Sequence, residues 1–263
     1  MQNQNLQVLR RIIHESKPRE PKTIDNPNLK TGWLLPYVLL ADDFLWHRWD
    51  HWYRTKAAGK IVSPIPQIEW CKNQAGFKML ERCLSCITRY GDWRGWSSWN
   101  VFDYFLDWLL FGLGDRSQPN LPDEKDYTGA SNRLYQTFNV ETLLAYPYDY
   151  FGDILAENRF GRESGFFPTP MEVSQLLAAM IYGTEDARAK TICDPCVGTG
   201  RMLLAASNYS YRLYGSDINS TVIKACLVNG YMYAPWLVKP FQFFDAPEPT
   251  HQPKLKESLL LEV

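Results

Sequence analysis

The chain has 263 residues, 45% of them hydrophobic, and a formal net charge of −1. This composition is typical of a globular protein with a sizeable core, and it excludes one that binds nucleic acid through an overall basic surface. Any DNA contact must then come from a local patch or a partner. The N-terminus lacks the apolar core of a secretory signal, and the longest apolar run, at 33–41, is too short to span a membrane. We expect a soluble cytoplasmic protein.

Six cysteines raise the question of a metal site. Cys83 and Cys86 form a CxxC pair, and His47 and His51 form an HxxxH pair, so the four side chains could be zinc ligands. The alternative is favoured, because Cys83 continues the apolar stripe of a predicted helix and free cysteine is a common core residue. We therefore predict no metal site.

The first half of the chain predicts helices and loops. Its helical patterns lie at 6–16, 37–57, 67–90 and 98–111. The polar, proline-containing stretch at 114–129 predicts a loop. Most aromatic residues precede residue 151, where their rings are expected to pack between helices. These features predict a helical N-terminal domain over 1–145.

From residue 166 onward, predicted helices and strands alternate. A helix at 170–183 precedes a strand, TICDP, a helix, RMLLAASN, a strand, RLYGSD, and a second helix, STVIKACLVNGYMYA. The stretch KPFQFFDAP is a candidate third strand that ends at Asp245. This order is the first half of a doubly wound sheet, so we predict an α/β fold for a second domain over 146–263. The helix at 170–183 carries one apolar face: Val173, Leu176, Leu177, Met180 and Ile181.

The stretch DPCVGTG, residues 194–200, follows the first strand and opens a helix. Gly198 and Gly200 allow a sharp turn and a close approach of backbone to a ligand, and the helix start offers free N–H groups. Glycines at this spacing also occur in many tight turns that bind no ligand. Asp194 strengthens the interpretation, because a carboxylate at a strand end can accept hydrogen bonds from a cationic amino group.

The second predicted strand ends in Asp217, within GSDIN. A carboxylate at this position can accept two hydrogen bonds from the vicinal diol of a ribose. Together, the two loops indicate a nucleoside ligand better than either loop does alone. The alternative is an ordinary turn aspartate followed by Asn219 as a helix cap.

Three stretches together resemble the motifs of the N6-adenine DNA methyltransferases, particularly the modification subunits of type I restriction systems. They are GFFPTP (165–170), DPCVGTG (194–200) and GSDIN (215–219), and the segment at 148–165 also resembles the one that precedes the FxTP motif in those subunits. The resemblance covers about 146–245. It implies a Rossmann-like core that binds S-adenosyl-L-methionine and serves adenine methylation.

The resemblance also implies roles for single residues. Phe167, Thr169 and Pro170 match FxTP, whose residues pack around the methionine portion of the cofactor. Asp194 matches the residue that holds the amino-acid end, and Asp217 matches the ribose ligand. Ile218 would flank the adenine ring, and Asp245 matches the carboxylate that accepts the adenine amino group. The other matched loop positions are Pro195, Cys196, Gly198, Thr199 and Gly200.

The sequence departs from the family at the methyl-transfer motif. That motif, [DNS]PP[YFW], binds the target amino group and stacks an aromatic ring on the flipped base, and no stretch of this sequence has its form. The nearest stretches are DNPNL at 25–29, YAPWL at 233–237 and DAPEP at 245–249. Each lacks a required residue or lies at the wrong place in the motif order. We therefore assign no catalytic residue.

We accordingly expect a truncated Rossmann-like core whose exposed sheet is covered by a protein partner or by self-association. One hypothesis is a split methylase, in which a second polypeptide supplies the methyl-transfer motif and DNA binds through that partner. Another is a non-catalytic cofactor-binding or structural subunit, a pseudoenzyme, in a restriction-modification, phage or mobile-element complex. A degenerate chain that binds nothing is the third interpretation.

Overall fold

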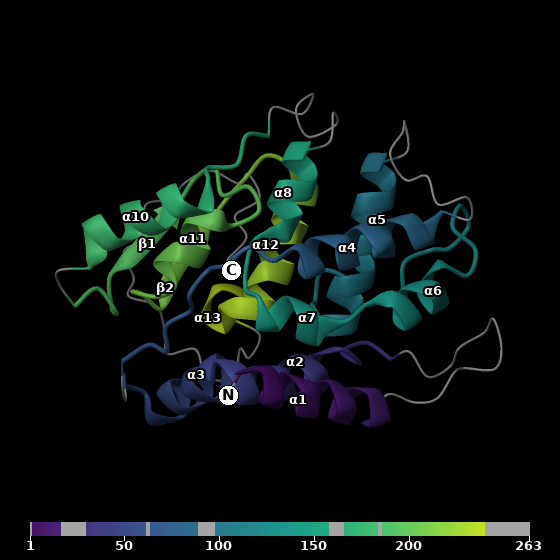
Figure 1. Cartoon of the computed structure of the whole chain (residues 1–263). Coiled ribbons are helices and arrows are strands. Elements are labelled where there is room, and N and C mark those ends of the chain that lie inside the picture. Colours follow the sequence, from purple (N-terminus) through teal and green to yellow (C-terminus); the bar gives the residue numbers. More distant parts are fainter. Residues whose placement is uncertain are drawn as a thin grey trace. The chain divides into compact units, whose positions relative to one another are not determined.

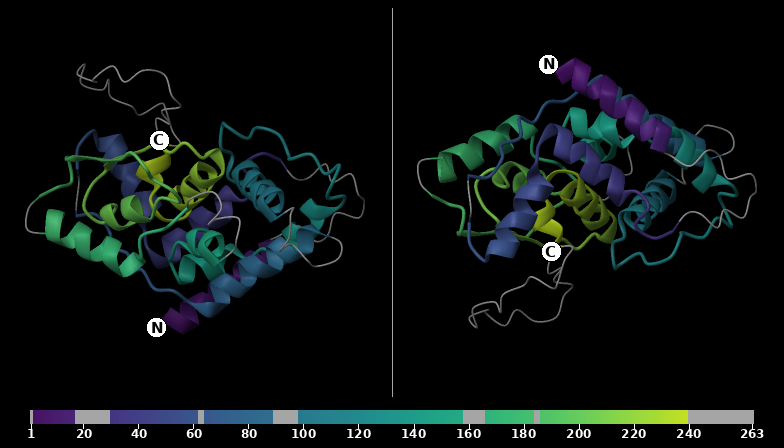
Figure 2. Two further views of the ribbon diagram at one scale, coloured as in Figure 1. Left: turned by 90° about the horizontal axis from the view of Figure 1, so that it is seen from above. Right: turned by 90° about the horizontal axis from the view of Figure 1, so that it is seen from below.

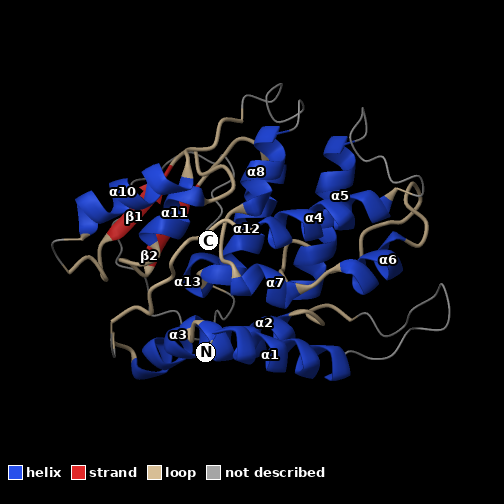
Figure 3. Ribbon diagram, in the orientation of Figure 1, coloured by secondary structure: helices blue, strands red, loops and turns tan. Residues whose placement is uncertain are grey.

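A computed structural model of the chain describes residues 2–16, 30–61, 64–88, 98–157, 166–183 and 186–239. Their secondary structure is mostly helical, with one sheet of two strands (Figure 3). The chain divides into two compact units. Unit 1 comprises Met1–Leu45 and Glu69–Phe167, and unit 2 comprises Trp46–Ile68 and Pro168–Val263.

Among the described residues of unit 1, all regular secondary structure is helical. The helices are α1 (Gln2–Ser16), α2 (Leu35–Leu45), α4 (Gln74–Ile87), α5 (Ser98–Leu113), α6 (Ala130–Thr137), α7 (Val140–Ala145) and α8 (Tyr150–Glu157) (Figure 1). Helix α5 is apolar on most sides and forms the centre of the core, with Phe105 and Trp108 fully buried. Both rings pack edge-to-face against Phe138, with centroids 6.2 and 5.9 Å apart. The expectation that aromatic rings pack between these helices is confirmed.

Two charged side chains of unit 1 form hydrogen bonds with the backbone at the start of α6 and at the end of α4. The Glu124 carboxylate accepts hydrogen bonds from the backbone N–H groups of Gly129 (2.8 Å) and Ser131 (2.7 Å) at the start of α6. Arg133 donates to the carbonyls of Cys86 (2.5 Å) and Ile87 (2.9 Å) at the end of α4. Helix ends leave such backbone groups without intrahelical partners. The polar loop predicted at 114–129 is therefore fastened to α6 by its own glutamate.

Unit 2 holds the parallel sheet. Its elements are α3 (Arg48–Ala58), α10 (Met171–Tyr182), β1 (Thr191–Asp194), α11 (Arg201–Ala206), β2 (Arg212–Gly215), α12 (Ser220–Tyr233) and α13 (Pro235–Val238). Strands β1 and β2 are parallel, with Thr191 opposite Arg212 and Asp194 opposite Gly215. Helix α11 forms the crossover between them. The strand-helix-strand-helix order predicted from the sequence is confirmed over 191–233.

The predicted apolar face of α10 is exposed. The helix packs on α11 through its other side, where Met171, Ser174 and Ala178 are buried, and Figures 1 and 2 show the two helices side by side. The exposed fractions of the apolar face are 41% for Val173, 58% for Leu176, 37% for Leu177, 68% for Met180 and 55% for Ile181. A contiguous apolar surface of this kind commonly marks an interaction site.

Some predicted elements differ from the observed ones. The single helix predicted at 37–57 is two helices, because His47 adopts a left-handed backbone conformation with φ of 58° between α2 and α3. Helix α4 starts at Gln74 rather than at 67, since the Asn73 side chain accepts a hydrogen bond from the Ala75 N–H (2.8 Å) and caps it. The predicted third strand and Asp245 lie outside the described residues, so the larger Rossmann-like sheet stays a prediction.

The two units divide the chain differently from the ranges 1–145 and 146–263. Of the described residues, 46–61 and 64–68 belong to unit 2, and 146–157 belong to unit 1. Helix α3 provides part of the unit 2 core through Trp52, which packs on Tyr211 and Trp236. The boundary between independently folding domains near residue 145 stays a prediction.

His51 of α3 is buried in unit 2 and hydrogen-bonds the Tyr211 hydroxyl. Its burial, and then the nearby positive charge of Arg48, lower the pKa of His51 below its ordinary value of 6.5. The imidazole is therefore neutral at neutral pH.

Neither a metal site nor a membrane-spanning helix is found in the part of the chain that the structure describes. Within it, His, Cys, Asp and Glu side chains form no group of three or more able to hold a metal ion. No helix there is long and apolar enough to cross a membrane. Cys83 is buried in α4 with its Sγ 3.6 Å from the Met79 Sδ, as expected for a core cysteine.

Gly76→Ala tests the packing of α4 against α8. Alanine gains about 1 kcal/mol over glycine in a helix, but its Cβ would lie 2.5 Å from Cζ of Tyr150. Overpacking of this kind costs about 1–3 kcal/mol, so we expect a net loss in the free energy of unfolding, measured with urea. Adding Tyr150→Leu should make the alanine less costly. A more stable Gly76→Ala variant would contradict this close approach.

Candidate functional site

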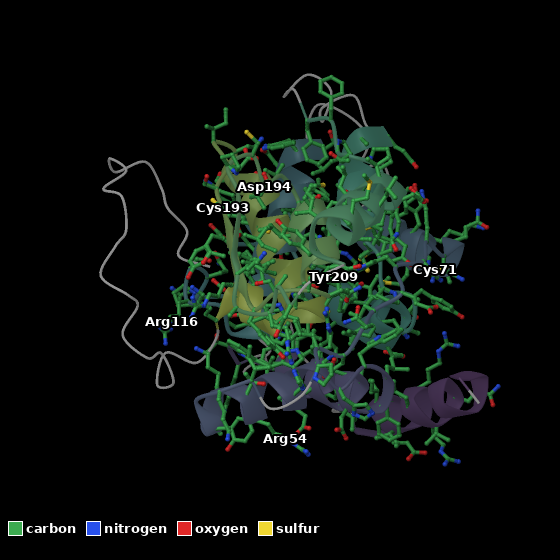
Figure 4. The ribbon with its side chains drawn as sticks, turned by 90° about the vertical axis from the view of Figure 1, so that its left-hand side faces the viewer. Arg54, Cys71, Arg116, Cys193, Asp194 and Tyr209 are labelled. Carbon is green, nitrogen blue, oxygen red and sulfur yellow. The ribbon has the colours of Figure 1, made fainter. Side chains whose placement is uncertain are left out.

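The carboxyl ends of β1 and β2 form the candidate site. Asp194 ends β1 opposite Gly215 at the end of β2, and each strand runs directly into a loop, at 195–200 and at 216–219. Figure 4 labels Cys193 and Asp194 side by side at the end of β1. Ligands of parallel α/β sheets bind beyond this edge of the strands.

Backbone hydrogen bonds extend the pairing of the strands into the loops. The Ser216 N–H donates to the Asp194 carbonyl (3.0 Å), and the Val197 N–H donates to the Ser216 carbonyl (2.9 Å). The Asp194 carboxylate accepts a hydrogen bond from the Cys196 N–H (3.0 Å) and is partly exposed. The two loops therefore leave the sheet side by side.

Asp217 bridges the two loops. One carboxylate oxygen accepts a hydrogen bond from the Gly198 N–H (2.9 Å), and the other accepts one from the Asn219 N–H (3.0 Å). The Asn219 side chain in turn caps α12 by accepting from the Thr221 N–H (3.0 Å). The contacts of a turn aspartate and a helix cap are thus present. Asp217 nevertheless remains partly exposed and also holds the glycine loop.

The glycines have structural reasons of their own. Gly198 and Gly200 have φ angles of 55° and 90°, in the left-handed region that other residues rarely adopt. A Cβ on Gly200 would lie 2.7 Å from the Sγ of Cys226, so α12 passes directly behind the loop. In β2, a Cβ on Gly215 would lie 2.7 Å from Cγ2 of Val197. These positions require glycine whether or not a ligand binds.

Two buried polar side chains that the sequence did not single out also hold this region. Asn229 of α12 is 1% exposed and donates to the Thr199 carbonyl (2.9 Å). Arg201 is 6% exposed and donates to the Thr169 carbonyl (3.1 Å), which joins the segment before α10 to the start of α11. A single asparagine within the apolar stretch ACLVNGYMYA is the sequence feature from which the Asn229 contact could have been predicted.

The remaining predicted cofactor residues differ in their exposure. Pro195 and Cys196, at the start of the loop, are exposed, whereas Thr199 and Gly200, at its end, are buried. Ile218 is 106% exposed, so it has no packing role in the structure.

The segment before α10 contributes further predicted positions. Thr169 is partly buried, and Pro170 is the N-cap of α10. Phe167 is 78% exposed and is the last residue of unit 1. The assignment of each of these residues to a cofactor stays a prediction.

The stretch YAPWL cannot act as a methyl-transfer motif in this fold. Its last three residues, 235–237, lie in α13, and Trp236 is 0% exposed, so its ring cannot stack on a base. DNPNL and DAPEP lie outside the described residues.

Paired substitutions test the packing behind the glycine loop. Gly215→Ala should destabilise the protein by about 1–3 kcal/mol, and adding Val197→Ala should recover much of that loss by making room for the new methyl group. Gly200→Ala should recover less when Cys226→Ala is added, because the positive φ costs a further ~1–2 kcal/mol. Denaturant unfolding of all four variants measures the difference. Equal recovery in the two pairs would contradict the strain at Gly200.

The chain was compared with known proteins. Residues 140–234 match the family model of the N-6 DNA methylases. The chain is 27% identical over 118 residues to the type II methyltransferase M.VspI of Vibrio sp. (strain 343), and this match covers 43% of the chain but 28% of that methyltransferase. No solved structure matches the chain. The matched range contains both loops of the candidate site, and over this range the chain is similar to the N-6 DNA methylases.

Proposed function

We propose that the chain binds S-adenosyl-L-methionine at the loops 195–200 and 216–219 and serves as the cofactor-binding part of an adenine-N6 DNA methyltransferase. The observation that carries this proposal is the Asp217 carboxylate, held between the two loops by the N–H groups of Gly198 and Asn219. It stands where two parallel strands end, which is where such sheets bind nucleosides. The family match over 140–234 supports the same ligand.

The partly exposed carboxylates suit the donor groups of this cofactor. A carboxylate oxygen has two lone pairs, and on each oxygen of Asp217 one backbone N–H is bound. Capacity remains for the two ribose hydroxyls. Asp194 has one oxygen engaged by the Cys196 N–H, so it can also accept from the cationic amino group of the methionine portion.

The other predicted positions would surround these two carboxylates. Thr169 and Pro170 would pack on the methionine portion, and Ile218, whose side chain contacts no protein core, would cover the adenine ring. Phe167 would add an aromatic face, which a sulfonium cation favours. The Rossmann-like sheet proposed for the larger fold, with Asp245 at its third strand, belongs to the same proposal.

The cofactor supplies an electrophilic methyl group, and we propose that the target amino group is held by polypeptide outside these 263 residues. No stretch of the sequence has the form [DNS]PP[YFW], and the only tryptophan of YAPWL is buried. The exposed apolar face of α10 supports a protein partner or a second copy in contact with unit 2. DNA would then be bound largely through that partner.

A second candidate is a non-catalytic subunit that binds the cofactor without transferring the methyl group. The absence of the [DNS]PP[YFW] motif from the sequence supports this candidate as much as it supports the partnered enzyme. The two candidates differ in one outcome, which is methyl transfer in the presence of the partner.

Cofactor binding is tested by calorimetry with S-adenosyl-L-methionine. We expect the wild type to bind and Asp217→Ala to bind more weakly by about 1–3 kcal/mol, because ribose donors lose their acceptor. Asp186→Asn is the matched control for a lost charge, since Asp186 pairs with Arg188 before the start of β1. Thermal unfolding without cofactor shows whether Asp217→Ala has lost the fold instead. Absence of binding by the wild type, or equal affinity in Asp217→Ala, would refute the proposed site.

Methyl transfer is tested with labelled cofactor and adenine-containing DNA. We expect label in DNA only when the gene products encoded beside this chain are added, because the methyl-transfer motif is absent from its sequence. Transfer by the 263 residues alone would overturn the proposed division of labour. Binding with no transfer under any combination would favour the non-catalytic subunit.

A further inference from the structure

Arg48, the first residue of α3, is a fully buried cation outside the range that matches the family. Its guanidinium donates five hydrogen bonds within unit 2. The acceptors are the Pro66 carbonyl (3.0 Å), the Ser207 hydroxyl (3.0 Å), the Ser207 carbonyl (2.9 Å), the Asn208 side-chain oxygen (3.1 Å) and the Tyr233 carbonyl (2.6 Å). Arginine has five N–H donors, so each has an acceptor.

Two of these acceptors are the carboxyl ends of helices. Ser207 is the C-cap of α11, and Tyr233 is the last residue of α12. Carbonyl groups at these positions have no intrahelical donor, so a buried helix end needs one from elsewhere. A single guanidinium meets this need for both helices and thereby fixes the two ends relative to each other.

Neighbouring residues of the same segment make the attachment rigid. The Arg48 guanidinium lies over the ring of the buried Trp236, 4.5 Å from its centroid. The Trp49 indole N–H donates to the Tyr231 carbonyl near the end of α12 (3.0 Å). Asn208, in the turn after α11, exchanges two hydrogen bonds with the backbone of Ile68 (2.9 and 3.1 Å). The segment 46–68 is thus bound at both of its ends.

The opposite ends of the same two helices carry the candidate site. Helix α11 starts directly after Gly200, and α12 starts directly after Asn219. The hydrogen bond from the Gly198 N–H to Asp217 spans the gap between these starts. Rigid secondary elements can couple the two sites at their ends, so the arrangement of the carboxyl ends bears on the positions of the two loops.

From these contacts we infer that Arg48 is a positioning residue for the two loops, and that residues 46–68 are an integral part of the cofactor-binding unit. This inference rests on the proposed function for its consequence on binding, but its structural part does not. Removing the fork of donors releases the ends of α11 and α12, and the loops then lose their fixed separation. Lysine cannot replace arginine here, because it has three donors and no planar fork.

The test uses the full chain with Arg48→Lys and Arg48→Met, at a temperature where circular dichroism matches the wild type. Selective ¹⁵N-glycine labelling reports the Gly198 amide without any cofactor. We expect its signal to shift in both variants because its hydrogen bond to Asp217 lengthens. We also expect the affinity for S-adenosyl-L-methionine to fall about tenfold or more, the equivalent of roughly one lost buried hydrogen bond.

Leu237→Ala is the control for a merely structural effect. Leu237 is fully buried in α13 of the same unit, and its truncation lowers stability without removing a donor from either helix end. It should leave the Gly198 signal and the affinity as in the wild type. If it changes both as strongly as Arg48→Met does, or if Arg48→Met changes neither, the inference is wrong.

Ser207→Ala provides a milder variant should the Arg48 variants fail to fold. It removes one acceptor of the guanidinium and keeps the others, so we expect the same direction of change in the Gly198 signal with a smaller loss of affinity. An unchanged Gly198 signal in a folded Ser207→Ala protein would then count against Arg48. A wild type that binds no cofactor would refute the proposed function, while the Gly198 signal would still decide the structural inference.

Discussion

Unit 2 depends on the burial of one guanidinium. An ionised side chain taken out of water costs several kcal/mol unless its donors are hydrogen-bonded. At Arg48 the acceptors come from three stretches of the chain: Ser207 and Asn208 at the end of α11, Tyr233 at the end of α12, and Pro66. The guanidinium thereby joins a segment near the start of the described chain to segments near its end.

A second charged side chain, Asp217, holds the two loops at the amino-terminal ends of α11 and α12. Asp217 holds the glycine loop and starts the turn into α12, so its carboxylate has a structural reason to be there. The same holds for Gly200, which lies against Cys226, and for Gly215, which lies against Val197. The residues of this motif therefore have packing reasons of their own, and their presence alone does not show that a ligand binds.

Helix α10 behaves differently from the rest of the unit. Its small side chains, Ser174 and Ala178, face inward, and its large apolar side chains face out. A helix normally buries the wider apolar stripe, since that is where most of the hydrophobic free energy lies. The arrangement is understandable if another surface completes the packing, as the proposed partner would.

The sequence by itself determined the order of the local elements in unit 2 and the resemblance to a known family. The apolar runs and glycine turns of 191–233 fixed two strands, their crossover helix and the helix after them, because these elements are specified by neighbouring residues. The motifs around Asp194, Asp217 and Thr169 indicated a resemblance to the N-6 DNA methylases, and the family model matches the same part of the chain, 140–234. Local patterns also revealed the core position of Cys83.

Only the tertiary structure decided which distant residues meet. The residues around Arg48 do not predict that its guanidinium donates hydrogen bonds to Ser207 and Tyr233, because these residues are far from Arg48 in the sequence. The break at His47 required a left-handed backbone angle at a non-glycine residue, which propensity does not predict. The exposure of the apolar face of α10 could not be predicted either. Periodicity shows which residues share a face of the helix, but it does not show which neighbour that face meets.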